Sequence, residues 1–170
     1  MCQSALLVID VQRGLFQKST PIYHTESLLD NILTLVNRAQ TAGAPIIYVQ
    51  HCANRDLVKG SEAWQLHPRL APRHVDPLVY KEHGNAFEAT PLREILTERR
   101  VVRLVVCGLV THGCVKATCL GALALGYPLT LAADAHSSYS QKADQLITEW
   151  NAKLQAAGAV LQPTAEIAFD

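Results

Sequence analysis

The sequence predicts an α/β protein with three layers, in which a mostly parallel, open sheet of about six strands carries helices on both faces. Two observations lead to this prediction. Apolar runs of strand length alternate with segments whose apolar residues recur at helical spacing, which is typical of parallel strands joined by helices. No internal repeat, low-complexity tract or linker interrupts this pattern. With 170 residues, of which 49% are hydrophobic, the chain is expected to form one domain over residues 1–170.

The N-terminal half of the chain is expected to supply three strands and one helix. The helix is indicated by apolar residues at helical spacing over residues 26–42, where Thr25 can cap the first turn and Gly43 can end the last. The long segment before the third strand is too polar and too rich in proline for a regular element. The three strands are expected over residues 5–10, 45–50 and 78–81.

The C-terminal half is expected to supply three more strands and three helices. Thr90 followed by Pro91 is a typical start for the first of these helices, and Ser138 or Ser140 can cap the last one. Gly126 and Gly158 can end the second and third helices. The strands are expected over residues 101–107, 127–132 and 159–161, and the helices over residues 91–98, 115–125 and 141–157.

Composition limits the class of partner. Lys+Arg and Asp+Glu are equal at 15 each, so there is no excess charge for nucleic acid or an anionic membrane, and a small-molecule substrate with water is expected instead. No apolar stretch approaches the roughly 20 residues that span a bilayer, and no signal peptide is recognised, which predicts a cytoplasmic protein. The five cysteines contain no C-x-x-C pair, which argues against a disulfide framework or zinc ribbon; they are Cys2, Cys52, Cys107, Cys114 and Cys119.

Three chemically different side chains are placed at the ends of predicted strands. Asp10 ends the first strand, Lys81 ends the third, and Cys114 opens the helix that follows the fourth. Ligands of open α/β sheets bind at the carboxyl ends of strands near the point where strand order reverses, so these groups are expected to converge. A helix N-terminus and Lys81 would lower the pKa of the thiol, and Asp10 could take its proton. This combination predicts a cysteine hydrolase.

At these residues the chain resembles the isochorismatase-like cysteine hydrolases, which include nicotinamidases and N-carbamoylsarcosine amidase. The resemblance implies that Asp10, Lys81 and Cys114 form a catalytic triad and that Cys114 forms an acyl-enzyme which water cleaves. It also implies a cis peptide bond between Leu109 and Val110, and an oxyanion hole made by the N–H groups of Val110 and Cys114. The matching segments are residues 6–12, 79–81, 85–87, 90–92, 108–115, 126–127 and 133–135.

The sequence departs from the metal-binding relatives of this family. Nicotinamidases carry an Asp-x-His motif after the second strand, whereas residues 48–54 here contain His51 but no such motif. His51 and His67 alone do not make a metal site of three or four ligands, so neither a metal nor another cofactor is expected. Because Cys114 is present, the favoured substrate is an amide, a carbamoyl compound or a related C–N compound rather than a vinyl ether.

Further residues are candidates for the wall of the substrate pocket. His112 could cap the cysteine helix or touch substrate, and Asp134 is expected to make structural hydrogen bonds. Cys107 and Cys119 are expected in the core. The pocket candidates are Gln12, Leu15, Phe16, Trp64, His67, Phe87, His112 and Tyr139.

Alternative functions and the oligomeric state follow from the same residues. A vinyl-ether hydrolase of the isochorismatase type and a noncatalytic redox or partner-binding relative are kept as alternatives. A nucleotide-binding domain is disfavoured because no G-x-G-x-x-G or P-loop follows a predicted strand. Apolar surface and the habit of the family suggest a homo-oligomer, either a dimer or a tetramer.

Overall fold

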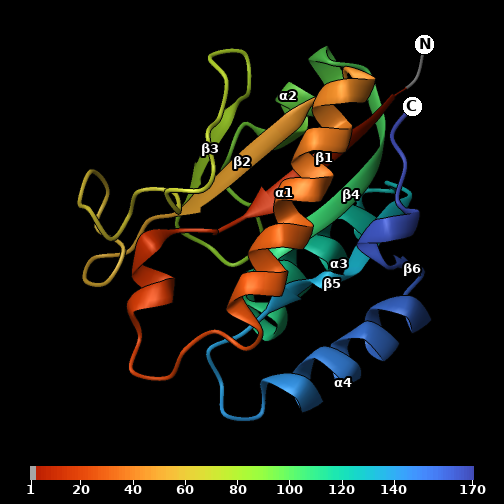
Figure 1. Ribbon diagram of the computed structural model, residues 1–170. Coiled ribbons are helices and arrows are strands. Elements are labelled where there is room, and N and C mark those ends of the chain that lie inside the picture. The colour runs from red at the N-terminus through yellow and green to blue at the C-terminus, as the bar shows by residue number, and fades with distance from the viewer. Residues whose placement is uncertain (1–2) are drawn as a thin grey trace.

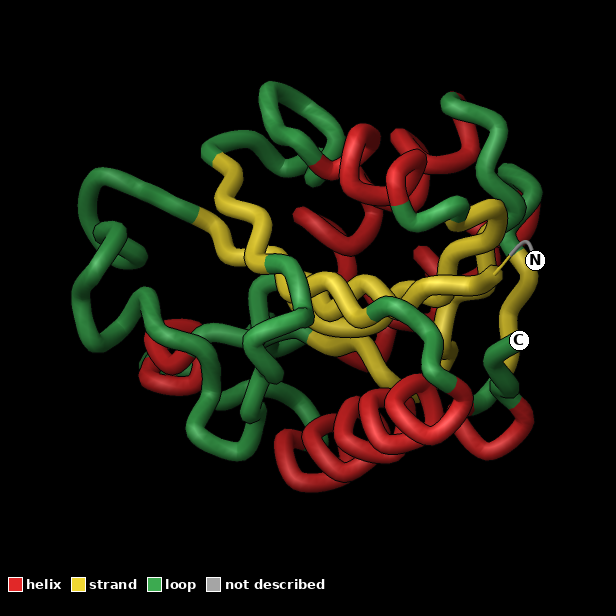
Figure 2. Tube along the Cα trace, turned by 90° about the horizontal axis from the view of Figure 1, so that it is seen from above, coloured by secondary structure: helices red, strands yellow, loops and turns green. Residues whose placement is uncertain are grey.

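The computed structural model describes residues 3–170, which form a six-stranded, all-parallel sheet with helices on both faces (Figures 1 and 2). The predicted three-layer α/β fold is therefore confirmed. The strand order is β3-β2-β1-β4-β5-β6. The strands are β1 (Gln3–Ile9), β2 (Ile46–His51), β3 (Leu78–Lys81), β4 (Val101–Leu109), β5 (Leu129–Ser137) and β6 (Val160–Gln162).

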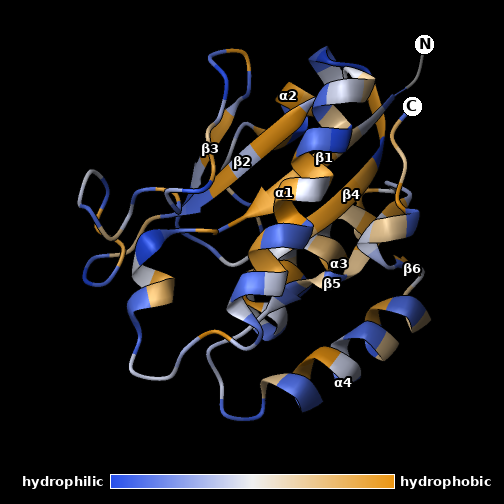
Figure 3. Ribbon diagram, in the orientation of Figure 1, coloured by the Kyte–Doolittle hydropathy of each residue, from blue (hydrophilic) through white to orange (hydrophobic). Residues whose placement is uncertain are grey.

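The two faces of the sheet are buried by different helices. Alternate residues of β1 point to opposite sides, so Leu6 and Val8 pack on one face while Leu7 and Ile9 pack on the other. The first face is covered by the apolar side of α1 and the second by α2, α3 and α4, and the strands between them are strongly apolar (Figure 3). The helices are α1 (Thr25–Ala42), α2 (Leu92–Glu98), α3 (Lys116–Ala124) and α4 (Ala143–Ala156).

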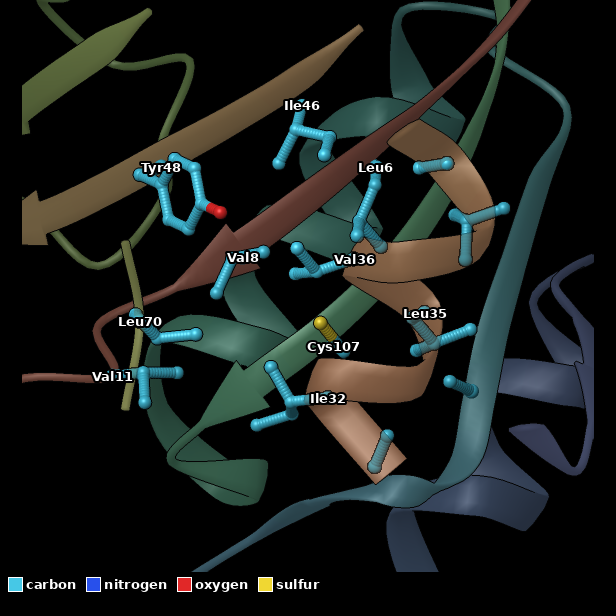
Figure 4. Close-up of a cluster of buried hydrophobic side chains, with 14 of the residues drawn as sticks. Leu6, Val8, Val11, Ile32, Leu35, Val36, Ile46, Tyr48, Leu70 and Cys107 are labelled. Atoms are coloured by element: carbon cyan, nitrogen blue, oxygen red, sulfur yellow. The ribbon is translucent and has the colours of Figure 1, made fainter. Parts of the chain in front are cut away.

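The cysteines of the core lie in these two clusters, as expected. Cys107 packs against Val8 and Ile32 in the cluster beneath α1 (Figure 4), and Cys119 lies in the cluster on the opposite face. Both are fully buried, whereas Cys52 and Cys114 are partly exposed and Cys2 lies outside the described residues. Across residues 3–170, every helix is too short or too polar to cross a membrane.

The strand order places the reversal of the chain between β1 and β4. The chain runs from β1 outward to β3, and then returns to β4 on the other side of β1. Gly108 of β4 lies beside Ile9 in the register of these strands and has a φ of +120°. A Cβ atom on Gly108 would lie 2.1 Å from the carbonyl oxygen of Ile9, so only glycine fits this contact. The ends of β1 and β4 therefore meet closely at the topological switch point.

Helix starts differ from the sequence-based expectations. Thr25 does not cap α1, because its hydroxyl donates to the carbonyl oxygen of Ile22 (2.7 Å) and the capping position is taken by His24 in a left-handed conformation. Gly43 ends α1 with a φ of 71°, as predicted. The last helix begins at Ala143, because the Ser140 hydroxyl accepts the N–H of Lys142 and closes a turn there.

The segment around Cys114 contains a kink that the sequence did not predict. Residues Thr111–Val115, which we call the nucleophile turn, join β4 to α3 and contain a kink at Gly113. Gly113 has non-helical angles inside this turn. Cys114 directly follows this kink, and the α-helical angles of Val115 and Lys116 place it at the start of the helical segment that continues into α3.

Strand β5 is longer than predicted because it pairs with β4 a second time. After a register shift, His136 and Ser137 lie beside Gly108 and Leu109. Asp134 therefore lies within the strand, where its Oδ1 accepts hydrogen bonds from the N–H and hydroxyl of Thr164, both at 2.7 Å. This is the structural role expected for Asp134.

His136 connects the nucleophile turn to α4. Its Nδ1 lies 2.8 Å from the hydroxyl of Thr111, and its Nε2 lies 2.8 Å from Oδ1 of Asn151. Since an amide oxygen only accepts, Nε2 carries the ring proton and Nδ1 accepts from Thr111. Burial lowers the pKa of His136 from 6.5 to about 4. The neutral imidazole is therefore the form that supports the turn.

We predict that His136 makes the protein sensitive to acid. The pKa of His136 is lower in the folded state than in the unfolded state, so neutral His136 contributes fully to the free energy of unfolding above about pH 6.5. As the pH falls towards 4, about 3 kcal/mol of the free energy of unfolding is lost. Urea unfolding of His136→Asn at pH 7 and pH 4 should show a smaller loss of unfolding free energy than wild type. The exposed His74→Asn is the control; equal losses in wild type and His136→Asn would contradict the assignment.

Candidate active site

Asp10, Lys81 and Cys114 come together at the topological switch point. The Lys81 Nζ lies 2.9 Å from Oδ2 of Asp10 and 3.1 Å from Sγ of Cys114. Asp10 directly follows β1, Lys81 ends β3 and Cys114 lies in the nucleophile turn after β4. The convergence inferred from strand ends is therefore present. The Leu109–Val110 peptide bond just before the nucleophile turn is cis.

His51 is a fourth member of this cluster. It ends β2 in register with Lys81, and its Nδ1 lies 3.0 Å from the Lys81 Nζ. An ammonium group has only donors, so Nδ1 accepts and the ring proton lies on Nε2. All three N–H bonds of Lys81 are thereby directed to Asp10, His51 and Cys114.

Gln12 fixes the backbone of His51. Its amide nitrogen donates to the His51 carbonyl oxygen (3.0 Å), and its amide oxygen accepts the His51 N–H (2.8 Å). The same nitrogen also donates to the carbonyl oxygen of Trp64 (2.9 Å). Gln12 is fully buried, so it positions the cluster from behind and does not line the cavity as the sequence suggested.

Asp10 and Lys81 form a buried ion pair. The side chain of Lys81 is 0% exposed and that of Asp10 is 3% exposed, so each charge depends on the other for compensation. Oδ1 of Asp10 is buried without a hydrogen-bond partner. This free oxygen is an acceptor for a proton within the site.

The thiol of Cys114 is protonated in the resting site. Burial, followed by the charge of Asp10, raises its pKa to about 12, although Lys81 acts in the opposite direction. Lys81 lowers this pKa, as the sequence predicts, but the expected net lowering is wrong because desolvation and the charge of Asp10 outweigh Lys81. Burial and then Lys81 lower the pKa of His51.

A cavity of about 280 Å³ opens onto Cys114. Of the pocket residues predicted from sequence, Leu15 and Tyr139 lie in its wall, together with Val110. The sequence did not indicate the remaining lining residues, which are Lys18, His51, Ala53, Asp56 and Leu57. His51 could have been found by the strand-end rule, but Lys18 and Asp56 lie in irregular segments that carry no periodic signal. A larger hollow of about 680 Å³ shares His51, Ala53 and Lys81 with the site.

Five other residues that were predicted for the pocket wall lie away from the cavity at Cys114. Phe16 packs on His67 with ring centroids 4.5 Å apart, and Phe87 stacks on Tyr127 at 5.9 Å. Trp64 is buried against Tyr80. His112 does not cap a helix, since its Nδ1 is buried without a partner. None of Phe16, Trp64, His67, Phe87 and His112 lines the cavity at Cys114.

The cluster does not fit a metal ion. Within residues 3–170, Asp10, His51 and Cys114 form a group whose potential ligand atoms all lie within 4.8 Å of one another. The Lys81 ammonium contacts all three of these residues, so a metal cation among them would face a buried positive charge. His67 is not part of the group; its Nδ1 accepts the N–H of Arg69 at 3.3 Å.

Comparisons with known proteins give a consistent result. The sequence model of the isochorismatase domain matches residues 4–166. Streptothricin hydrolase of Streptomyces noursei is 33% identical over 137 residues, covering 79% of this chain and 54% of that protein. N-carbamoylsarcosine amidase of an Arthrobacter species is 26% identical over 145 residues, covering 72% of this chain and 55% of that protein. The chain thus spans about half the length of these curated relatives.

A solved structure extends the similarity to the fold. The crystal structure of an isochorismatase family protein superimposes with a TM-score of 0.89 and 31% sequence identity. The match covers 94% of this chain and 97% of that chain. The two proteins therefore have the same overall fold.

We predict that Asp10→Asn and Lys81→Met shift the reactivity of the Cys114 thiol in opposite directions. Asp10 raises the thiol pKa and Lys81 lowers it, so alkylation by iodoacetamide at pH 8 should be about tenfold faster in Asp10→Asn and slower in Lys81→Met. Intact-protein mass spectrometry with peptide mapping measures the rate at Cys114. Circular dichroism confirms that both variants are folded.

Asp56→Asn serves as the matched control for this experiment. It removes a carboxylate from the cavity wall that is not hydrogen-bonded to Lys81, so its alkylation rate with this neutral reagent should stay near wild type. Slower alkylation of Asp10→Asn would show that Asp10 does not hold the thiol in its protonated form.

Proposed function

This chain belongs to the isochorismatase family, and from this premise we propose that it is a metal-independent cysteine hydrolase of a small amide, carbamoyl or related C–N substrate. The observation that carries the proposal is the Lys81 ammonium, which contacts both the Asp10 carboxylate and the Cys114 thiol beside a cavity. The names of the two relatives, a hydrolase and an amidase, support the same chemistry.

The first half of the reaction forms a thioester. Oδ1 of Asp10 takes the thiol proton while Sγ of Cys114 attacks the substrate carbonyl carbon. The N–H groups of Val110 and Cys114 donate hydrogen bonds to the developing oxyanion. When the C–N bond breaks, the Asp10 carboxyl gives its proton to the leaving nitrogen, so Asp10 is ionised again and the acyl group is on sulfur.

The second half of the reaction reverses these roles with water. Asp10 takes a proton from water as the water oxygen attacks the thioester, and the carbon–sulfur bond then breaks. The proton returns from Asp10 to the departing sulfur, so the resting thiol is restored. The Lys81 ammonium contacts Oδ2 of Asp10 at 2.9 Å, so its charge offsets that of the buried carboxylate.

The alternative functions fit the site less well. A redox sensor needs a thiolate at neutral pH, whereas the pKa of Cys114 is raised to about 12. Vinyl-ether hydrolysis proceeds by protonation and would leave the Cys114 thiol without a role. The arrangement of acid, cation and thiol therefore favours acyl transfer.

We predict that hydrolysis depends on Cys114 alone among the cysteines. An ammonia-release screen over amides, carbamoyl compounds and ureides should identify substrates, and Cys114→Ala should lower turnover by roughly 10³-fold or more because the nucleophile is removed. Mass spectrometry of intact protein, quenched during turnover, should show an acyl adduct on wild type. Cys52→Ala, which removes a partly exposed thiol outside the Cys114 cavity, should keep its activity. Unchanged turnover in Cys114→Ala would refute the thioester mechanism.

A further inference from the structure

An ion pair forms part of the wall of the cavity at Cys114. The Nζ of Lys18 lies 2.5 Å from Oδ2 of Asp56, and both residues line the 280 Å³ space that also contains Cys114. Leu15, Leu57 and other apolar groups make up much of the remaining wall. Apart from the catalytic cluster, this pair brings the only full charges to the cavity wall among the described residues.

The two members of the pair differ in their surroundings. The side chain of Lys18 is 28% exposed, whereas that of Asp56 is 71% exposed. The Lys18 ammonium also lies 5.9 Å from the centre of the Tyr139 ring, which belongs to the same wall. Lys18 is thus partly enclosed, while Asp56 is largely in water.

This asymmetry determines which member can change its partner. An ion pair with one exposed member contributes little to stability, so Asp56 can turn into solvent at small cost. A substrate that fills the cavity would then remove water from Lys18, whose charge needs a new partner. We expect the new partner of Lys18 to be a carboxylate, because the Asp56 carboxylate is the group that contacts the Lys18 ammonium in the structure.

Lys18 is also the cation of this cavity that is available to a substrate. Lys81, the cation of the adjoining catalytic cluster, has its three N–H bonds directed to Asp10, His51 and Cys114. A volume of about 280 Å³ is just below the range of about 300–1,000 Å³ that is typical of ligand sites. The cavity at Cys114 therefore fits a small substrate.

We propose that Lys18 is the specificity-determining residue of this site and binds a carboxylate on the substrate, so that the substrate is a small amide or carbamoyl compound with a negative charge. This inference rests on the proposed function and adds to it the charge of the substrate. Asp56 occupies the carboxylate position until the substrate displaces it.

The test compares two alkylating reagents of nearly equal shape. Iodoacetate carries a carboxylate and iodoacetamide does not, and the ratio of their rates at Cys114 cancels the fraction of thiolate. Lys18→Met should lower the iodoacetate to iodoacetamide ratio about tenfold, because a charge-assisted hydrogen bond is lost. Asp56→Asn should raise the ratio several-fold, because the competing carboxylate is removed.

Other outcomes of this test would overturn the proposal. A ratio that stays within twofold of wild type in Lys18→Met means that Lys18 does not bind the carboxylate. An equal fall of both rates in Lys18→Met means that Lys18 only supports the loop. Because alkylation is measured at Cys114 itself, both reagents can be applied before any natural substrate is identified.

Hydrolysis of matched compounds separates this proposal from the proposed function. Succinamate and N-carbamoylglycine are the anionic members, butanamide and propylurea are their neutral counterparts, and 3-aminopropanamide is cationic. Wild type should prefer the anions in kcat/KM, and Lys18→Met should lose about 10- to 100-fold on the anions only.

The outcomes of the hydrolysis experiment are distinct. Equal hydrolysis of anionic and neutral members by wild type would refute the role of Lys18 and leave the cysteine mechanism intact. A preference for 3-aminopropanamide that Asp56→Asn abolishes would assign the selection to Asp56 instead. Activity of Cys114→Ala on any of these compounds would refute the proposed function itself.

Discussion

The three N–H bonds of the Lys81 ammonium hold the site together. Their acceptors are Asp10 after β1, His51 at the end of β2 and Cys114 after β4, so one nitrogen joins the ends of neighbouring strands. A buried ammonium without these partners would be strongly unfavourable, and removing one member of such a pair costs about 3–5 kcal/mol. The sheet order is therefore coupled to the chemistry: it brings the strand ends to one point, and Lys81 needs all of them there.

The segment after β1 supplies more than one part of this arrangement. Asp10 has a φ of 49°, which turns the chain off the strand, and two residues later Gln12 hydrogen-bonds both backbone groups of His51. One short stretch thus provides the acceptor for the thiol proton and fixes the residue that orients Lys81. On the opposite side, Gly108 allows the close approach of β4 that places the nucleophile turn beside Asp10.

The sequence was sufficient to predict the layers of the fold and the meeting of Asp10, Lys81 and Cys114. Both depend on strong signals, namely the period of apolar residues and the rule that parallel strands end at one edge. It was not sufficient for the pKa of the Cys114 thiol. The direction of that pKa shift depends on how far burial and the charge of Asp10 outweigh the charge of Lys81, and this balance is determined only by the packing of the site. Lys18 and Asp56 were missed because nonlocal contacts between irregular segments leave no periodic pattern.

The site contains two ion pairs with different consequences. In the buried pair, all three donors of Lys81 are used, so it cannot exchange a partner without breaking the cluster. In the ion pair at the cavity wall, the Asp56 side chain is 71% exposed, so it can move away from Lys18 without exposing buried residues. A substrate can therefore compete for Lys18 but not for Lys81. Selection of the substrate and generation of the nucleophile therefore depend on different cations. Substitutions at Lys18 and Asp56 can change which substrate charge the cavity accepts, while Asp10, Lys81 and Cys114 stay the same.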